Sequence, residues 1–228
     1  MIAKILQTLV RKKTPIVFND LLRTFPVSST FGLDRGTPID RYYIDAFLSC
    51  NSKHITGNVL EVAESNYSIK YGENVNKYLI INPVGVDDNT NVVGDLTNMS
   101  TLPAELIDCF ICTQTFNFIY DLEKAVAGAY HLLKPGGVLL ATVAGLCQVS
   151  RYDMDRWGDY WRFTTASVQR AFGQVFEENL DVRSYGNVLA ACAILQGIAV
   201  EDLPNPTLLD DNDPDYQVVI AIIARKPS

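Results

Sequence analysis

The sequence is poor in the residues that mark several common classes of binding protein. Lys and Arg number 19 against 26 Asp and Glu, which gives a formal net charge of −7. A general nucleic-acid binder needs a basic face for phosphates, so this balance argues against a nucleic-acid partner. No apolar run approaches the ~20 residues that a spanning helix needs, and we therefore expect no membrane span.

Histidine is also scarce, and the cysteines do not follow a metal-binding pattern. The chain has two His and five Cys. Cys109 and Cys112 form a C-x-x-C pair, but a zinc site would need a second pair of ligands, and none follows at similar spacing. We predict no metal, and we expect reduced, buried thiols, as is typical of a cytoplasmic protein.

The start of the chain lacks the order of a secretory leader, because its apolar residues precede its basic ones. Ile2, Ile5, Leu6 and Leu9 have helical spacing, and residues 11–13 are all basic. Two interpretations stay open for residues 1–13. They form a helix packed on this domain or on a partner, or they associate weakly with a membrane surface.

What the chain does contain is an alternation of apolar strands and amphipathic helices. Its 228 residues, 48% hydrophobic and 20% charged, fit a single domain. Strands are expected at 58–63, 77–82, 91–96, 106–114, 137–145, 180–186 and 217–226. Helices are expected at 41–50, 121–133, 164–176 and 187–203. This order predicts an α/β fold, a doubly wound and mostly parallel Rossmann-like sheet over 56–228, preceded by a lead-in over 1–55.

Ligands of such sheets bind at the carboxyl ends of the strands, where the strand order reverses. Glu61 lies within the first strand. A dinucleotide-binding turn would have Gly at three positions after it, where this sequence has Ala63, Ser65 and Tyr67. That absence disfavours a nicotinamide-dependent oxidoreductase. Asn82 stands near the position of the usual ribose-binding acid, and its amide can still donate and accept hydrogen bonds. The polar run 113–115 ends the fourth strand, and a polar cluster at such a position is typical of the floor of a binding pocket.

Several motifs together resemble the class I S-adenosylmethionine-dependent methyltransferases. They are "VLEVAESNY", "VVGDLTN", "LKPGG" and "GDYWRFT". Two further segments, "FGLDRGTPIDRYYID" and "SRYDMDRWGDYWRFT", resemble a bacterial subgroup associated with glycan and polysaccharide biosynthesis. The resemblance covers roughly residues 30–228. It implies a seven-stranded sheet with an antiparallel last strand, and S-adenosylmethionine as cofactor.

The resemblance also assigns cofactor-binding roles to individual positions. Residues facing the methionine part would be Glu61, Ala63, Glu64 and Ser65. Asn82 would replace the ribose acid, and Asp95 and Leu96 would contact the adenine. The pocket near the sulfonium would be lined by Thr113, Gln114 and Thr115. Two departures from the family pattern stand out, namely the missing glycines of the first turn and the Asn at position 82.

The segment 151–164 combines carboxylates, arginines and aromatic rings, which suits a sugar that stacks on rings and offers hydroxyls to acceptors. Asp153, Asp155 and Asp159 are unranked candidates for a general base. Arg156 and Arg162 could hold a phosphate or carboxylate of the acceptor. The alternative is a structural loop whose charges pair with each other.

Residues 31–43 form either a lid over the site or an N-terminal brace. Asp34, Arg35 and Asp40 are secondary candidates there. We expect methyl transfer to a small acceptor, a sugar hydroxyl or a nucleotide-sugar, in a cytoplasmic enzyme. The alternative is a degenerate, non-catalytic protein of the same fold that binds a partner through 151–163.

Overall fold

The computed structural model describes residues 22–83 and 91–228. Within them, seven strands form one sheet in the order β3-β2-β1-β4-β5-β7-β6. The pairs β2–β3, β1–β2, β1–β4 and β4–β5 are parallel, whereas β7 runs antiparallel to both β5 and β6. The predicted α/β class, with its antiparallel last strand, is confirmed. The proposed helix or membrane-surface segment at 1–13 lies outside the described residues.

The elements follow the predicted order closely. The strands are β1 (Gly57–Val62), β2 (Val75–Asn82), β3 (Val92–Val93), β4 (Ile107–Thr113), β5 (Leu133–Ala144), β6 (Leu180–Tyr185) and β7 (Val219–Arg225). The helices are α2 (Ile39–Cys50), α3 (Asn66–Tyr71), α4 (Leu122–Leu132), α5 (Arg151–Met154), α6 (Thr165–Phe176) and α7 (Val188–Gln196). None of the helices in the described ranges is long and apolar enough to cross a membrane.

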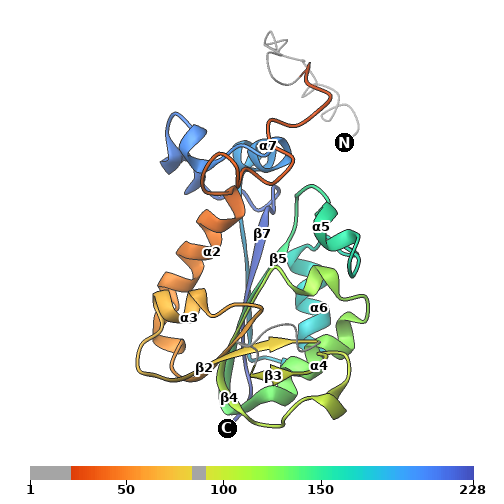
Figure 1. The fold of residues 1–228 in the computed structure, drawn as a ribbon. Coiled ribbons are helices and arrows are strands. Elements are labelled where there is room, and N and C mark those ends of the chain that lie inside the picture. The colour runs from red at the N-terminus through yellow and green to blue at the C-terminus, as the bar shows by residue number, and fades with distance from the viewer. Residues whose placement is uncertain (1–21, 84–90) are drawn as a thin grey trace, which may run out of the picture.

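Helices cover both faces of the sheet, with α2 and α3 on one side and α4 and α6 on the other (Figure 1). Successive side chains of β4 point to opposite faces of the sheet, so this strand packs against the helices on both faces. Phe110 and Cys112 belong to the core formed with α4 and α6. Cys109 and Ile111 pack in the core with α2. By the same alternation in β5, Leu140 packs on the α2 side, and so the side chain of Thr142 faces that side too.

Two predicted elements are much shorter in the structure, and two short helices were missed. The strand expected at 91–96 is only Val92–Val93, because the chain turns after it and Asp95 Oδ1 accepts from the Thr97 amide at 2.8 Å. The helix expected at 187–203 ends at Gln196, where Gly197 adopts a left-handed φ of 65°. Helices α3 and α5 were not predicted.

Residues 31–38 are fixed to the turn that follows α7, which favours the brace over the lid. Arg35 donates to both carboxylate oxygens of Asp202 at 2.7 Å. The backbone amide and the hydroxyl of Thr37 donate to Glu201, also at 2.7 Å. Asp34 turns the other way and accepts from the Thr30 hydroxyl at 2.9 Å. A lid would have to break these contacts to open.

The cysteines are free, and no disulfide joins them. Cys109 and Cys112 are buried, as predicted, and burial raises the pKa of the Cys112 thiol to about 12. Cys50 and Cys192 are exposed. The expectation of burial was wrong for Cys192, because α7 turns this residue of its apolar run toward solvent.

Candidate functional site

The strand order reverses between β1 and β4. In open α/β sheets ligands bind outside the carboxyl ends of the strands at such a reversal, and this position is here called the crevice. The chain builds β1, β2 and β3 in one direction and then returns to lay β4 and β5 on the other side of β1. Ala63 follows β1, Asn82 ends β2, and Gln114 follows β4. The fold therefore brings the predicted cofactor-binding positions to one edge of the sheet.

The turn after β1 adopts a glycine-like conformation without a glycine. Ala63 has a φ of 66°, in the left-handed region that costs a non-glycine residue roughly 1–2 kcal/mol. Its amide donates to the Ile81 carbonyl at 3.2 Å, which ties the turn to β2. Ala63 and Glu64 are exposed beside the crevice. Alanine, the residue with the smallest side chain after glycine, thus adopts the strained backbone conformation that a glycine would adopt at this position.

Glu61 is the buried carboxylate of β1, and its partners lie in α3. It is 3% exposed and accepts from the amides of Tyr67 at 3.1 Å and Ser68 at 2.7 Å, and from the Ser68 hydroxyl at 2.5 Å. Burial raises the pKa of Glu61, and the hydrogen bonds from Ser68 and Tyr67 oppose that shift. In this structure Glu61 holds α3 against the sheet.

The turn after β4 carries a buried amide group with no partner among the described residues. Gln114 has a φ of 49°, and its backbone amide donates to the Thr142 carbonyl at 2.8 Å. The side-chain Nε2 is buried and unpartnered in the described part of the chain, as is the Thr142 hydroxyl. Leaving such a group unsatisfied costs about 1–3 kcal/mol. Both groups are therefore suited to meet a bound polar ligand.

Asp40 shows the same feature on the face covered by α2. Its Oδ1 is buried and has no hydrogen-bond partner in 22–83 or 91–228. Burial raises the pKa of Asp40, and the neighbouring charge of Arg41 opposes that shift. Arg41 itself donates to the Tyr67 hydroxyl at 2.6 Å. The sequence identified Asp40 only as a secondary candidate, because spacing does not reveal burial.

The remaining cofactor-side positions lie at the β2–β3 end of the crevice. Asn82 is half-buried, and its carbonyl accepts from the Gly94 amide at 3.0 Å. Asp95 is exposed, and its Oδ1 accepts from the Thr97 hydroxyl at 2.9 Å. Leu96 is 6% exposed and packs in the core beside α4. This end combines hydrogen-bonding groups with an apolar floor.

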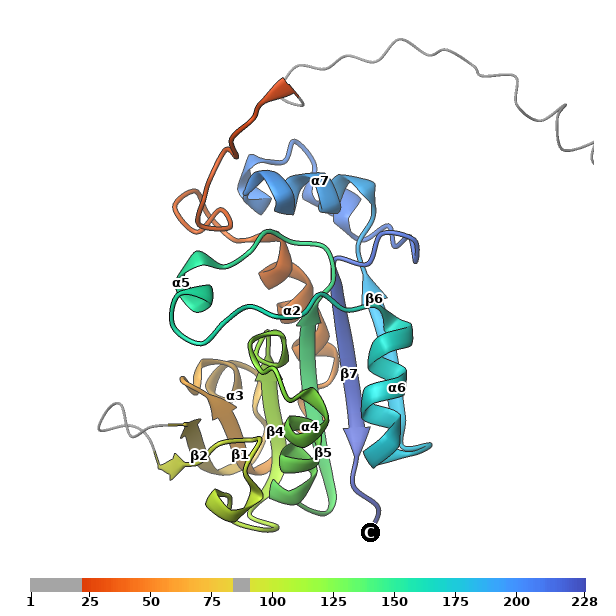
Figure 2. The same cartoon turned by 90° about the vertical axis from the view of Figure 1, so that its right-hand side faces the viewer.

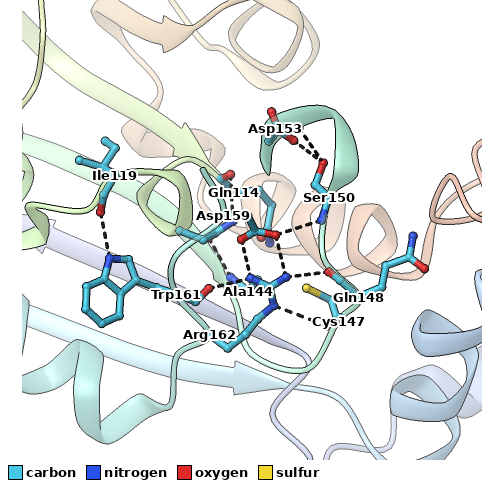
Figure 3. Close-up of polar contacts among 11 residues, drawn as sticks. Gln114, Ile119, Ala144, Cys147, Gln148, Ser150, Asp153, Asp159, Trp161 and Arg162 are labelled. Atoms are coloured by element: carbon cyan, nitrogen blue, oxygen red, sulfur yellow. Dashed lines mark hydrogen bonds and ion pairs between the residues drawn. The ribbon is translucent and has the colours of Figure 1, made fainter. Parts of the chain in front are cut away.

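The loop between β5 and α6 lies over the same edge of the sheet (Figure 2). Its central contact is between Asp159 and Arg162, with Nη1–Oδ1 at 2.6 Å and Nη2–Oδ2 at 2.8 Å (Figure 3). Asp159 also accepts from the Ser150 amide at 2.9 Å. Burial opposes the ionisation of Asp159, yet these hydrogen bonds hold its pKa below the usual range.

The other charged residues of this loop also bond within it. Asp153 accepts from the Ser150 hydroxyl at 2.5 Å and from Trp157 Nε1 at 3.0 Å. Asp155 accepts from Arg151 at 3.1 Å on an exposed surface. The guanidinium of Arg156 lies 3.5 Å from the ring centroid of Tyr152. These contacts match the alternative in which the charges of the segment pair with each other.

Asn117 joins the loop after β4 to the loop after β5, and sequence analysis missed it. It is 3% exposed. Its Oδ1 accepts from the Ala144 amide at 3.2 Å, and its Nδ2 donates to the Gln114 carbonyl at 3.3 Å. Its carbonyl accepts from the Tyr160 amide at 2.9 Å. The available signal was a single amide residue inside the aromatic run "TFNFIY".

Three exposed aromatic side chains meet where these two loops touch. Tyr120 lies 5.3 Å from Tyr160 and 6.1 Å from Trp161, measured between ring centroids. Trp161 Nε1 donates to the Ile119 carbonyl at 3.0 Å, which fixes its ring (Figure 3). The three rings, here called the aromatic cluster, are between 37% and 67% exposed.

No group of three or more His, Cys, Asp or Glu side chains in the described ranges could hold a metal ion. The described residues at this edge include buried polar groups, ion pairs and aromatic rings.

Comparisons with known proteins agree with this architecture. Residues 48–141 match the family described as a methyltransferase domain. No curated protein sequence matches the chain. The N-methyltransferase NodS of Bradyrhizobium japonicum, solved with S-adenosyl-L-homocysteine, is 15% identical; the match covers 89% of this chain and 95% of that one, with a TM-score of 0.51.

Two further solved structures extend the likeness. Phosphoethanolamine N-methyltransferase 2 of Haemonchus contortus, solved with S-adenosyl-L-methionine, is 12% identical over 81% of this chain and 53% of that one, with a TM-score of 0.53. A SAM-dependent methyltransferase of Thermotoga maritima is 15% identical over 82% and 91%, with a TM-score of 0.51. At these identities the likeness is one of fold. The chain has the Rossmann-like fold of the class I methyltransferases.

Proposed function

We propose that the chain binds S-adenosylmethionine at the carboxyl ends of β1, β2 and β4 and transfers its methyl group to a sugar hydroxyl. The observation that carries the proposal is the buried Nε2 of Gln114, which has no hydrogen-bond partner within 22–83 and 91–228, at the reversal of strand order in a methyltransferase fold. A ligand with an acceptor oxygen at this point would satisfy that amide. Nothing in the described part of the chain favours the non-catalytic alternative.

The residues at the crevice fit this cofactor group by group. Gln114 Nε2 can donate to the carboxylate of its methionine part, near the exposed turn at Ala63. Asn82 can hydrogen-bond to the ribose hydroxyls, and Asp95 can accept from the exocyclic amine of the adenine beside Leu96. The bound cofactor supplies a methyl group activated by its sulfonium. The protein has to align the acceptor with that group and exclude water.

Asp40 is the carboxylate that we assign to removing the acceptor's proton. Asp153 and Asp159 each accept hydrogen bonds that hold the loop together, and exposed Asp155 is paired with Arg151. Asp40 has a buried oxygen that no described residue satisfies. A raised pKa also makes a carboxylate a better base near neutral pH. Asp155 is the next candidate of the four, because a single exposed ion pair is easily displaced.

The aromatic cluster supports a sugar as the acceptor. Tyr120, Tyr160 and Trp161 present ring faces at the edge where the cofactor would bind. The apolar face of a sugar ring stacks on such surfaces, and its hydroxyls then reach neighbouring carboxylates. Arg156 is exposed on the same loop and could hold the phosphate of a nucleotide-sugar, whereas both terminal nitrogens of Arg162 are engaged within the protein.

A methyl-transfer assay against a sugar panel tests the proposal. The protein would be incubated with S-adenosylmethionine labelled in its methyl group, together with monosaccharides and nucleotide-sugars. We expect label to pass to at least one sugar and S-adenosylhomocysteine to form in equal amount. Replacement of Trp161 by Ala should raise KM for that sugar. Transfer only to amines or thiols would overturn the choice of acceptor, and the absence of transfer to any acceptor would overturn the enzyme.

A further inference from the structure

A polar pocket lies at the opposite edge of the sheet, where the parallel strands begin. It has a volume of about 300 Å³, and its lining includes Lys53, His54, Thr56, Asp108 and Arg225. His54 precedes β1, and Arg225 ends β7, near the C-terminal end of the chain (Figure 1). The pocket is therefore separated from the proposed cofactor site by the length of the strands.

The contact between His54 and Arg225 indicates which nitrogen of the His54 ring carries a proton. Arg225 Nη2 lies 2.9 Å from His54 Nε2. A guanidinium can only donate, so His54 Nε2 must accept and the neutral ring carries its proton on Nδ1. Burial lowers the pKa of His54, and the charges of Arg225 and Lys53 lower it further. Burial first, and then the two neighbouring cations, therefore favour the neutral form of His54.

The positive charge of this pocket has no counter-ion among the residues described. Lys53 and Arg225 form no ion pair with any carboxylate in 22–83 or 91–228. The carboxylate that faces them, Asp108, is already engaged. It accepts from Lys134 at 2.8 Å and from the Asn58 amide, also at 2.8 Å. This local positive charge, on a chain of net charge −7, favours the binding of an anionic ligand.

We propose that this pocket binds the phosphate group of a small ligand, separately from the proposed methyl-transfer site. The fork of Arg225 can donate to two phosphate oxygens, and Lys53 adds a point charge. His54, once it takes a proton from solvent, would release Arg225 and donate to a third oxygen. The volume accommodates a phosphate with a small organic group attached, and the ligand that we propose is a phosphorylated small molecule.

NMR of the histidine side chains tests this site directly. The full chain has two histidines, so His131 serves as an internal reference for His54. Inorganic phosphate would be titrated at constant ionic strength while both imidazoles are followed across a pH series. Phosphate should shift the His54 signals saturably and raise the pKa of His54, and His131 should not respond. If sodium chloride reproduces the change, or both histidines move together, the site does not exist.

Two substitutions sharpen the result. Arg225→Gln and Lys53→Gln should each weaken the apparent affinity for phosphate, the first by about tenfold or more because it removes a two-pronged contact. Arg170→Gln, on the exposed surface of α6, is the matched control and should leave the affinity unchanged. Binding of S-adenosylhomocysteine should be the same in all three variants. If Arg225→Gln retains full phosphate affinity, the proposed site is wrong, whatever the outcome at the cofactor crevice.

Discussion

Asp159 and Arg162 form a two-pronged ion pair in which the carboxylate side chain is 1% exposed and the guanidinium side chain 28%. Arg162 continues from this pair to the carbonyls of Cys147 and Gln148, at 3.4 Å and 2.7 Å. The pair therefore closes the loop after β5 upon itself, over the edge of the sheet that carries the proposed site. The shape of the acceptor side depends on it.

Replacing Arg162 with Ala should destabilise the protein by about 3 kcal/mol, because Asp159 would be left buried without its cation. Arg162→Lys should retain the charge but lose the two-pronged contact, so its stability should lie between those of wild type and Arg162→Ala. Denaturant unfolding of each variant measures the effect, with Arg170→Ala as an exposed control expected within about 0.5 kcal/mol of wild type. A loss no larger than that of the control would show that the pair does not hold the loop.

The same pair predicts a pH dependence. The pKa of Asp159 is lowered in the folded protein, so its stabilisation is complete above the unfolded value, near 3.8, and is lost as pH falls through the folded value. Arg162→Ala should therefore lose most stability near neutral pH and approach wild type in strong acid. Unfolding curves of both proteins should be measured from neutral to acid pH. A difference in unfolding free energy that stays the same across this range would contradict the prediction.

Ala63→Gly should stabilise the protein by about 1 kcal/mol, because glycine adopts a φ of 66° without strain. Ala127→Gly, within helix α4, is the matched control and should destabilise it by a similar amount. Thermal unfolding of both variants would show shifts of opposite sign. Two shifts of the same sign would mean that the turn after β1 is not strained.

Asp40→Asn should make the protein more stable than wild type at neutral pH. The folded-state pKa of Asp40 is raised by burial, so wild type loses stability as pH rises from the unfolded value through the folded one. The Asn variant removes that loss, and the gap between the two should widen with pH. Asp155→Asn, at an exposed position, is the control and should stay within about 0.5 kcal/mol of wild type at neutral pH. In the assay on sugars, Asp40→Asn should reduce kcat with little change in cofactor affinity.

Asn117→Ala should destabilise the protein by about 1–3 kcal/mol, because the buried Ala144 amide loses its acceptor. The Gln114 carbonyl loses a donor at the same time. We therefore expect weaker binding of S-adenosylhomocysteine as well, by calorimetry. Asn179→Ala, at an exposed position just before β6, is the control. If Asn117→Ala is destabilised but binds S-adenosylhomocysteine with unchanged affinity, Asn117 does not contribute to the proposed cofactor site.

The sequence predicted most strands of the sheet well because they are apolar runs of characteristic length, such as 107–113. The resemblance added the antiparallel last strand. Helix α3 was missed because its sequence, "NYSIKY", has no apolar stripe, and its place is fixed by the buried carboxylate of Glu61. Local propensity says little about an element that a tertiary contact holds in place.

Positions at strand ends were predicted better than their roles. Ala63, Asn82 and Gln114 do lie together at the carboxyl edge, because the topology alone brings them there. The pairing of Asp159 with Arg162 and the burial of Asp40 depend on how loops fold back, which spacing along the chain does not encode. Residues of one type, such as the three aspartates of 151–159, therefore looked equivalent until the structure distinguished them.

Isothermal titration calorimetry with S-adenosylhomocysteine tests the central claim most directly. Wild-type protein should bind one molecule per chain, and Gln114→Ala should bind it about tenfold more weakly, because the amide that meets the ligand is removed. Gln169→Ala, at an exposed position of α6, should bind like wild type. No heat of binding at ligand concentrations of about 1 mM would contradict the assignment of a cofactor site to this crevice.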